Sequence, residues 1–584
     1  MPEQISKQFD ALESILSKKT VFVLLFVIGF LVYSSSFMNN MFWDDYESII
    51  NNTYVTSWTY LPKYFTENLT AGSGIANNYW RPILLFSFSV DYKIGGFDPF
   101  IYHIQNTFWH ILSAFLVFVV GERLFQRRRA SFIAALLFLL YPLQTEAVTY
   151  VAGRADPMHT AFLLASFLFF LKLESAFSSD EKNGWFLRKE NLYSLLFFVL
   201  ALLVKERAIV LPFLVAMYLG LLYLEALKDR ALYIAKILTP YFVIGGVYAL
   251  LRVTVLKFAD TFDFGSTLTF GGASLFTKLL IYLKAIAQYL GLILWPGKLS
   301  MERIVTAPTA QDTLLILIGA MIVVASIVGI IISFKKKRTF AFGMLWFWIA
   351  FAPSFHVLPI QGILYEHWLY PAFPGLLFIV GLSFDQFLLE SKEKIRTACS
   401  ILFFFLLIAL GTRTIVRNLD WQNPIRFYEQ TVSAGGTTAR VYVNLGMAYH
   451  DAKQYDKAEE NYKKAIALDE TLFQPWMDLG NLYATEKKKE LAIDAFEHSI
   501  KNNPVYIPAY INLSAIYYND KEFTLGIETL QPVLEKFPQN VSVLYTTALM
   551  HYSLGEKGEA RTLLEKALQI DPNDKQSRTL LGVL

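Results

Sequence analysis

The chain has few of the residues that organise a soluble or secreted protein. A single cysteine, Cys399, occurs in 584 residues, which excludes a disulfide framework and a thiolate metal site. Charged residues make up only 17% of the chain, whereas 54% of it is hydrophobic and 16% aromatic, with a mean hydropathy of +0.39. A soluble globular protein of this size is less apolar. The composition therefore indicates a polytopic membrane protein.

Three further patterns are missing. The first apolar run has no small-x-small cleavage site, so we expect a retained first helix rather than a signal peptide. Inverted repeats with charges at the middle of the membrane, which are typical of transporters, do not occur. The formal net charge is only +3, so we expect no nucleic-acid partner.

About eleven apolar runs approach the length needed to cross a membrane as a helix. When these runs alternate in direction from a cytoplasmic N-terminus, every cluster of basic residues faces the cytoplasm. A twelfth run, Leu275–Trp295, would break this alternation, so we expect it to lie along the outer interface or to re-enter the membrane from that side. The polar motifs then all face one outer compartment. The eleven runs cover residues 20–37, 104–121, 130–142, 158–173, 191–204, 208–226, 232–251, 313–333, 339–352, 368–384 and 397–413.

The C-terminal part of the chain repeats with a period of 34 residues, for example between Leu445-Gly446 and Leu479-Gly480 (479 − 445 = 34). Pro504, Pro538 and Pro572 keep the same step. In such repeats small residues let paired helices approach, and prolines end the second helix. The pattern predicts about four tetratricopeptide repeats in an α-solenoid that binds extended peptide. We therefore expect a membrane domain over residues 1–423 and a repeat domain over 424–584.

Two adjacent acids, Asp44 and Asp45, follow the first apolar run, at the start of a large outer loop over residues 38–103. An anchoring helix usually ends in aromatic and basic residues, because charge next to hydrocarbon is costly. The acidic pair is therefore a candidate site, although it would also suit the cap of a following helix. A carboxylate at the membrane surface is suited to act as a general base.

Cations and further acids lie in later outer segments. Glu146, Arg154 and Asp156 place two acids and a guanidinium within one short segment. The guanidinium is a natural clamp for phosphate, although it would also simply neutralise the acids. Lys205 and Arg207 lie in a tight turn between two apolar runs, at the depth of a lipid phosphate.

Three smaller motifs complete the set of candidates. His103 and Asn106 share one helical face with His110, where interhelical hydrogen bonding and contact with a substrate are equally good explanations. Arg81 precedes a proline late in the first loop. Glu366 and His367 lie among aromatic residues near a late span. No further ligand has the spacing of a zinc site.

These motifs occur in an order that resembles the transmembrane and tetratricopeptide-repeat O-mannosyltransferases. These enzymes are GT-C glycosyltransferases that use polyprenyl-phosphate sugars. The resemblance covers almost the whole chain, although Trp43 stands where this family often has histidine. The matching residues, in order, are Trp43-Asp44-Asp45, Arg81-Pro82, Tyr102-His103 with Asn106, Thr145-Glu146-Ala147-Val148, Gly153-Arg154-Ala155-Asp156, Lys205-Glu206, Glu366 with Leu369-Tyr370-Pro371, and the repeats.

The resemblance implies an all-α, polytopic GT-C bundle followed by the repeat solenoid. It implies inverting transfer of mannose or another hexose from a polyprenyl phosphate to Ser or Thr hydroxyls of a protein recruited by the repeats. The base would be Asp44, the first acid of its motif, with Asp45 as second choice. Glu146 and Asp156 would position the acceptor or a metal. Positive charge for the lipid phosphate would come from Arg81, Arg154, Lys205 and Arg207.

Three points stay open at this stage. A divalent metal held by Asp44, Asp45 and Asp156 is one alternative to stabilisation by cations alone. A membrane-anchored repeat scaffold without catalysis is the alternative function. The site and the repeats are expected on the extracytoplasmic side of a plasma membrane, or in the lumen of the endoplasmic reticulum, in contact with membrane lipids.

Overall fold

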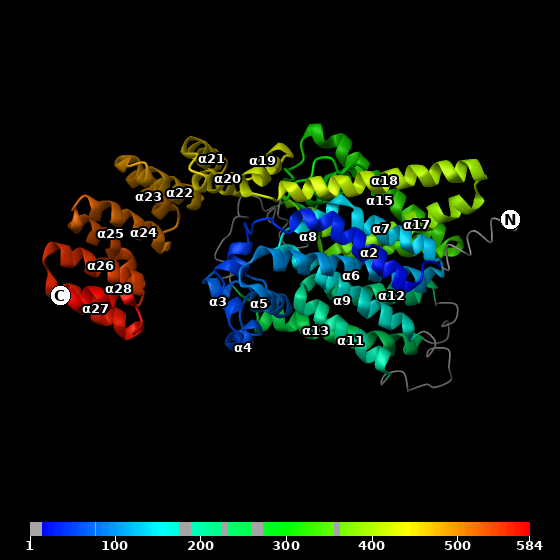
Figure 1. The fold of residues 1–584 in the computed structure, drawn as a ribbon, viewed down its shortest axis with the longest axis horizontal. Helices are drawn as coiled ribbons and strands as arrows, with labels where there is room; N and C mark the ends of the chain where they lie inside the picture. The colour runs from blue at the N-terminus through cyan, green and yellow to red at the C-terminus, as the bar shows by residue number, and fades with distance from the viewer. Residues whose placement is uncertain (1–14, 76, 174–187, 223–230, 259–272, 355–362) are drawn as a thin grey trace. The chain divides into compact units, whose positions relative to one another are not determined.

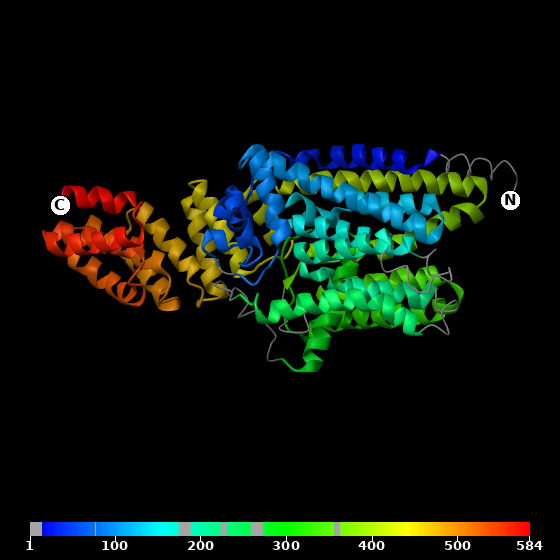
Figure 2. The same ribbon diagram turned by 90° about the horizontal axis from the view of Figure 1, so that it is seen from below.

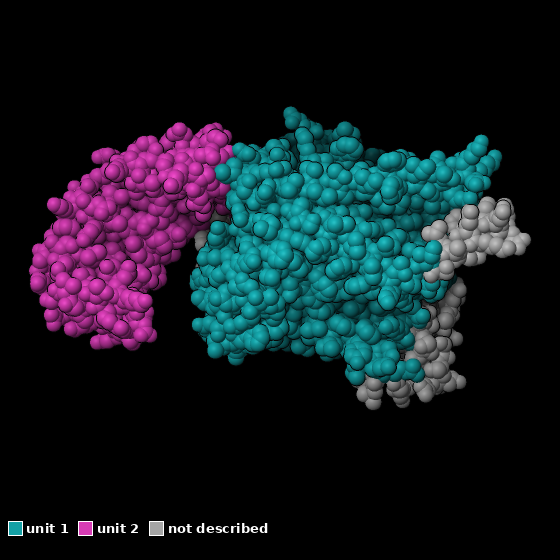
Figure 3. Space-filling view, in the orientation of Figure 1, with its two compact units in different colours: residues 1–436 teal, residues 437–584 magenta. Residues whose placement is uncertain are grey.

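The computed structural model describes residues 15–75, 77–173, 188–222, 231–258, 273–354 and 363–584. The chain divides into two compact units, residues 1–436 and 437–584, which Figure 3 colours separately. The described residues are helical apart from turns, loops and two short strands, β1 (Arg303–Ile304) and β2 (Ile363–Leu364). These strands pair antiparallel, with Arg303 opposite Leu364. The structure is thus essentially all-α, as predicted.

The long helices of unit 1 run side by side in a bundle (Figures 1 and 2). Their apolar side chains form one core, in which the ring of Phe167 meets that of Trp346 edge-on at 5.2 Å. The helices are α2 (Lys18–Tyr33), α6 (Pro99–Phe125), α7 (Arg128–Leu140), α9 (Ala155–Lys172), α11 (Lys189–Val204), α12 (Leu211–Leu222), α13 (Ala231–Thr254), α15 (Thr313–Lys336), α16 (Arg338–Phe351), α17 (Phe373–Glu390) and α18 (Glu393–Asp420).

Each of the eleven apolar runs overlaps one of these helices, but several of the helices are short. In the described ranges, seven helices are long and apolar enough to cross a membrane, or eight if α7 and the bent segment Pro142–Thr149 form one span. The helices α7, α11, α12 and α16 have 13, 16, 12 and 14 residues, below the ~20 residues that span a bilayer. The candidate spans indicate a multi-pass membrane protein, and the count of eleven stays a prediction.

Helix α14 (Leu275–Leu294) is long and apolar enough to be a candidate span. It packs along α15, and Lys284 forms an ion pair of 2.8 Å with Asp312, just before α15. Tyr289 meets Phe351 at the end of α16, and the Ile293 carbonyl accepts a hydrogen bond from Tyr141, just after α7. The position of this segment along the outer interface stays a prediction.

The same end of the bundle carries the segments that contain the polar motifs, and we call it the loop end. Helices α3, α4 and α5 gather here in Figure 1. The shorter elements of unit 1 are η1 (Ser34–Ser36), η2 (Tyr46–Ile50), α3 (Thr53–Thr56), η3 (Trp58–Tyr60), α4 (Leu61–Tyr64), η4 (Ala71–Ser73), α5 (Pro82–Gly95), η5 (Pro142–Gln144), α8 (Thr145–Thr149), η6 (Ala152–Arg154), η7 (Glu206–Val210), η9 (Ala310–Asp312), η10 (Ala352–Ser354) and η11 (Glu366–Leu369).

Helix α19 (Pro424–Ser433) is the last helix of unit 1. The sequence places it in the repeat domain, whose first residue was expected at 424. In the structure Phe427 and Tyr428 are buried, and both rings contact Phe42 in the first loop. This packing moves the boundary between the units to residue 436.

Unit 2 consists of four helical hairpins and a final helix. In the turn of each hairpin one residue has a left-handed backbone. These residues recur every 34 positions, at Lys453, Lys487, Lys521 and Gly555. Each of the last three hairpins ends two residues before Pro504, Pro538 or Pro572, as predicted. The helices are α20 (Ala439–Asp451), α21 (Tyr455–Leu468), α22 (Gln474–Thr485), α23 (Lys489–Asn502), α24 (Ile507–Asn519), α25 (Phe523–Lys536), α26 (Val541–Leu554), α27 (Lys557–Ile570) and α28 (Lys575–Val583).

Two glycines of unit 2 give a matched test of its packing. A Cβ on Gly480 would lie 2.6 Å from the ring of Phe496, whereas a Cβ on Gly558 would meet nothing within 4 Å. Gly480→Ala should destabilise residues 437–584 by about 1–3 kcal/mol, because overpacking outweighs the helix propensity of alanine. Gly558→Ala should instead stabilise them by about 0.5–1 kcal/mol. Thermal unfolding of this segment by circular dichroism checks both signs, and equal shifts would contradict the helix contact.

Candidate functional site

The two acids of the first loop have opposite environments. Asp45 is buried, and its carboxylate accepts hydrogen bonds from the backbone N–H of Ala152 (2.8 Å) and of Phe42 (3.3 Å). Burial raises the pKa of the Asp45 carboxyl to about 8, although both N–H donors lower it. Asp44 is exposed. Asp45 therefore fastens the loop to the segment around Ala152, and Asp44 is the acid presented at the surface.

Arg154 lies in the interior, contrary to its predicted contact with a lipid phosphate. Its side chain is wholly enclosed and forms an ion pair of 2.5 Å with Asp91 of α5. It also donates to the Asn106 side chain at 2.6 Å and to the Tyr102 carbonyl at 3.1 Å, both in α6. Arg154 therefore joins α5, α6 and η6, and it organises the site without reaching a ligand.

The motif residues of α6 also serve the scaffold. Asn106 donates to the carbonyls of Val148, Tyr150 and Val151 at 3.0–3.2 Å. His103 contacts the Asn39 carbonyl at 3.1 Å, and both side chains are buried. Of the two explanations offered by the sequence, these contacts favour structural hydrogen bonding. They fix the segment that carries Glu146 and Asp156.

Three cations gather between α5, α9 and η7. The Lys205 ammonium lies 2.7 Å from the Asp156 carboxylate, and both side chains are almost enclosed. Arg81 makes two hydrogen bonds to Glu206, at 2.9 and 3.3 Å. Burial lowers the pKa of Lys205 to about 8; Asp156 opposes this shift and the neighbouring Arg207 and Arg81 add to it. The positive charges thus lie close enough to repel one another.

Arg207 is the cation without an ion pair. Its guanidinium donates to the Ser354 hydroxyl at 3.2 Å and lies 5.0 Å from the ring centre of Trp368. Among the residues that the structure describes, no carboxylate forms an ion pair with it. Burial lowers the pKa of Arg207, against the charges of Asp156 and Glu206. Three cations therefore face two carboxylates, and Glu206 is 41% exposed, so the group has an excess of positive charge.

Glu146 and His367 form a pair that joins α8 to η11. One oxygen of Glu146 lies 2.6 Å from the His367 Nδ1, and the other accepts the His367 backbone N–H at 2.9 Å. Two contacts to one carboxylate fix the imidazole plane, so the ring nitrogen that can meet a substrate is Nε2. Gly153 lets η6 lie close to α8, because a Cβ on Gly153 would lie 2.8 Å from the backbone carbonyl oxygen of Glu146.

Tyr365 connects the acidic loop with the cations. Burial raises the pKa of its hydroxyl well above the usual range, and the charges of Tyr79, Asp44 and Glu146 add to this. Its ring lies 5.3 Å from that of Trp368, which in turn lies against Arg207. The Tyr365–Trp368 ring pair therefore lies against Arg207, and the negative charges of Asp44 and Glu146 act on the Tyr365 hydroxyl.

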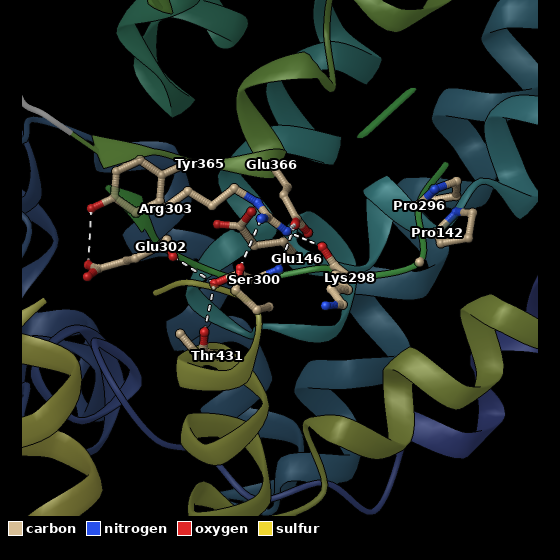
Figure 4. Close-up of polar contacts among 12 residues, drawn as sticks. Pro142, Glu146, Pro296, Lys298, Ser300, Glu302, Arg303, Tyr365, Glu366 and Thr431 are labelled. Atoms are coloured by element: carbon tan, nitrogen blue, oxygen red, sulfur yellow. Dashed lines mark hydrogen bonds and ion pairs between the residues drawn. The ribbon is translucent and has the colours of Figure 1, made fainter. Parts of the chain in front are cut away.

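Glu366 contacts the polar residues around Ser300 and Arg303, which Figure 4 shows. Its carboxylate accepts the Ser300 N–H at 2.6 Å and lies 3.6 Å from the Arg303 guanidinium. Ser300 also donates to the Thr431 carbonyl of α19 at 3.4 Å. Burial raises the pKa of Glu366 to about 7, although Arg417 lowers it. Glu366 thus holds the segment around Ser300 against α19.

The predicted residues fall into two groups. Asp44, Glu146, Asp156, Arg81, Lys205, Arg207 and His367 remain candidates for the site, whereas Asp45, His103, Asn106, Arg154 and Glu366 stabilise the surrounding segments. In the described ranges, no three His, Cys, Asp or Glu side chains are placed to hold a metal ion.

Sequence reasoning missed four contributors. Tyr365, Trp368 and Ser354 resemble ordinary residues of a membrane interface, and nothing in the pattern separates them from their neighbours. Asp91 could have been found from the sequence, because an acid inside the apolar run of α5 requires a cation as partner.

Comparison with known proteins agrees with the repeats. Residues 439–472, 473–506 and 541–574 each match the tetratricopeptide repeat family. These segments coincide with the first, second and fourth hairpins of unit 2. The third hairpin keeps the same 34-residue period in its left-handed turn.

Relatives match much of the chain at low identity. The protein O-mannosyl-transferase F38B6.6 of Caenorhabditis elegans is 24% identical over 461 residues, covering 76% of this chain and 62% of the relative. Protein O-mannosyl-transferase TMTC4 of Mus musculus is 26% identical, covering 75% of this chain and 65% of the relative. TMTC3 of the same organism is 21% identical, covering 76% and 51%. The chain thus spans about half to two thirds of these proteins, and it is a distant homologue of the TMTC protein O-mannosyl-transferases with tetratricopeptide repeats in its C-terminal unit.

Proposed function

We propose that the protein transfers a sugar, mannose or another hexose, from a polyprenyl phosphate to Ser or Thr hydroxyls of a protein, with inversion at the anomeric carbon. The observation that carries this proposal is the excess of positive charge around Arg207, which forms no ion pair with any residue that the structure describes. An almost enclosed cation is costly without an anion. A lipid phosphate at the membrane surface would supply that anion. The names of the relatives support the same reaction class.

In the proposed reaction Asp44 takes the proton of the acceptor hydroxyl. The hydroxyl oxygen then bonds to the anomeric carbon while the bond from that carbon to the phosphate oxygen breaks. The bonding electron pair stays with the polyprenyl phosphate, which gains one negative charge. Enzymes gain most when such developing charge meets preorganised cations. Arg207 and Lys205 are placed for this role, and Arg81 adds to the field.

The remaining site residues position these groups. Asp156 holds the Lys205 ammonium through their ion pair. Glu146 fixes His367, whose Nε2 would contact the acceptor hydroxyl or the sugar. Should a divalent metal take part, Asp44 and Asp156 are the acids nearest to the reaction. The concave face of the repeats would recruit an extended acceptor segment, on the same extracytoplasmic or lumenal side as Asp44.

The first test replaces the base. Asp44→Asn should lower transfer about 10²- to 10⁴-fold, the usual loss for a general base, and should leave donor affinity unchanged. Purified protein is incubated with a panel of polyprenyl-phosphate sugars and candidate acceptors, and products are identified by mass spectrometry. Glu47→Gln, which removes an acid from the same loop, is the control and should retain activity. An Asp44→Asn protein with wild-type transfer would pass the role of the base to Asp45 or Asp156, whereas a wild-type protein that transfers no sugar would support the non-catalytic repeat scaffold.

The second test concerns the phosphate. Arg207→Ala should weaken donor binding about 10- to 100-fold, because a charge-assisted hydrogen bond contributes about 1.5–3 kcal/mol. Isothermal titration with a polyprenyl-phosphate sugar measures this loss. Arg413→Ala is the control, since among the described residues Arg413 donates to the backbone carbonyls of Pro296 and Gly297 alone. Equal affinities of the Arg207→Ala and Arg413→Ala proteins would remove Arg207 from the donor site.

A further inference from the structure

Trp43, the residue before the proposed base, has a left-handed backbone with φ of 62°. This conformation is unfavourable for a residue with a Cβ, and it is unusual for a bulky side chain. Such strain persists only where the surrounding structure fixes it, and it is frequent at functional sites. The contacts of the Trp43 ring show what fixes it here.

The ring of Trp43 lies on helix α19. It stacks on Tyr428, with ring centres 5.4 Å apart and planes at 30°, and meets Phe427 edge-on at 6.2 Å. The neighbouring Phe42 lies 5.0 Å from Phe427. Aromatic pairs stabilise a fold beyond the area that they bury, so these contacts counteract the strain of Trp43. Burial raises the pKa of Tyr428 well above its usual range, and the charges of Asp44 and Asp45 add to this, which places Tyr428 beside the acids.

Helix α19 is itself held at both ends. The Asn423 side chain accepts the N–H of Arg426 and caps its first turn. After its last turn, Arg303 donates to the Ala434 carbonyl at 3.0 Å, and Ser300 contacts Thr431 as Figure 4 shows. The aromatic face that meets Trp43 is therefore part of a rigid support.

We propose that α19 is a positioning element for catalysis: the stack of Tyr428 on Trp43 holds the strained turn, and the turn aims the Asp44 carboxylate at the acceptor hydroxyl. This inference rests on the proposed function. Tyr428 acts through Trp43 and does not touch the reacting atoms. A misdirected base slows the chemical step and leaves the phosphate site intact, because Arg207 and Lys205 belong to other elements.

The test compares Tyr428→Ala with Tyr428→Phe in the full chain. Tyr428→Ala should lower kcat about 10- to 100-fold, the range expected for a displaced catalytic group, while KM for the donor stays within about twofold. Tyr428→Phe keeps the stacked ring and should therefore retain the kcat of the wild type. A Tyr428→Ala protein with wild-type kcat would overturn the proposal, and so would a Tyr428→Phe protein as impaired as Tyr428→Ala.

A second variant separates the stack from the strain. Trp43→Gly adopts the left-handed conformation without cost but loses the ring. It should lose kcat like Tyr428→Ala, and the double variant should lose no more than either single one. Full activity of Trp43→Gly would show that the stack has no positioning role.

Hydrogen exchange tests the positioning without turnover. The backbone amides of residues 42–48 should exchange at least tenfold faster in Tyr428→Ala than in the wild type. Unchanged exchange would overturn the positioning role. If wild-type protein transferred no sugar from any donor, the proposed function would fail, and the exchange result would still decide whether α19 orders the turn.

Discussion

Charge buried near the membrane surface must be compensated, and this constraint determines how the loop end of unit 1 is built. Leaving one partner of a buried ion pair unpaired costs about 3–5 kcal/mol. Arg154 is matched by Asp91, and Lys205 by Asp156, each across two different elements. Arg207 departs from the rule within the described residues, with a hydroxyl and an aromatic ring as its partners. The fold thus pairs these two buried cations with acids, and the unpaired guanidinium of Arg207 is the feature from which we propose a ligand site.

As a second consequence, adjacent residues at the loop end have different structural roles. Asp45 is anchored by backbone N–H groups and Asp44 is displayed. Likewise Glu366 holds a loop, whereas His367 is oriented by Glu146. In each pair one residue fixes the backbone so that its neighbour faces the site. Precise function requires such support from surrounding residues.

The sequence predicts the architecture better than it predicts the site. The 34-residue period yields the repeats, since every hairpin must bury the same face on its neighbours. The roles of Arg154 and Arg207 could not be separated, because both are arginines near acids in outer segments. Only the fold shows that Asp91 of α5 reaches Arg154 and that no acid in the described part of the chain pairs with Arg207. Similarly, the sequence could not show that Asp45 is the acid anchored in the interior. That anchoring depends on the backbone N–H of Ala152, which is 107 residues away.

The central claim is that the uncompensated charge at Arg207 binds the phosphate of the donor. A cryo-electron microscopy structure of the full chain in nanodiscs, with a polyprenyl-phosphate sugar bound, tests it most directly. The account predicts phosphate oxygens within hydrogen-bond distance of Arg207 and Lys205, and the anomeric carbon facing Asp44. A phosphate bound elsewhere, with Arg207 still on Ser354 and Trp368, would contradict it.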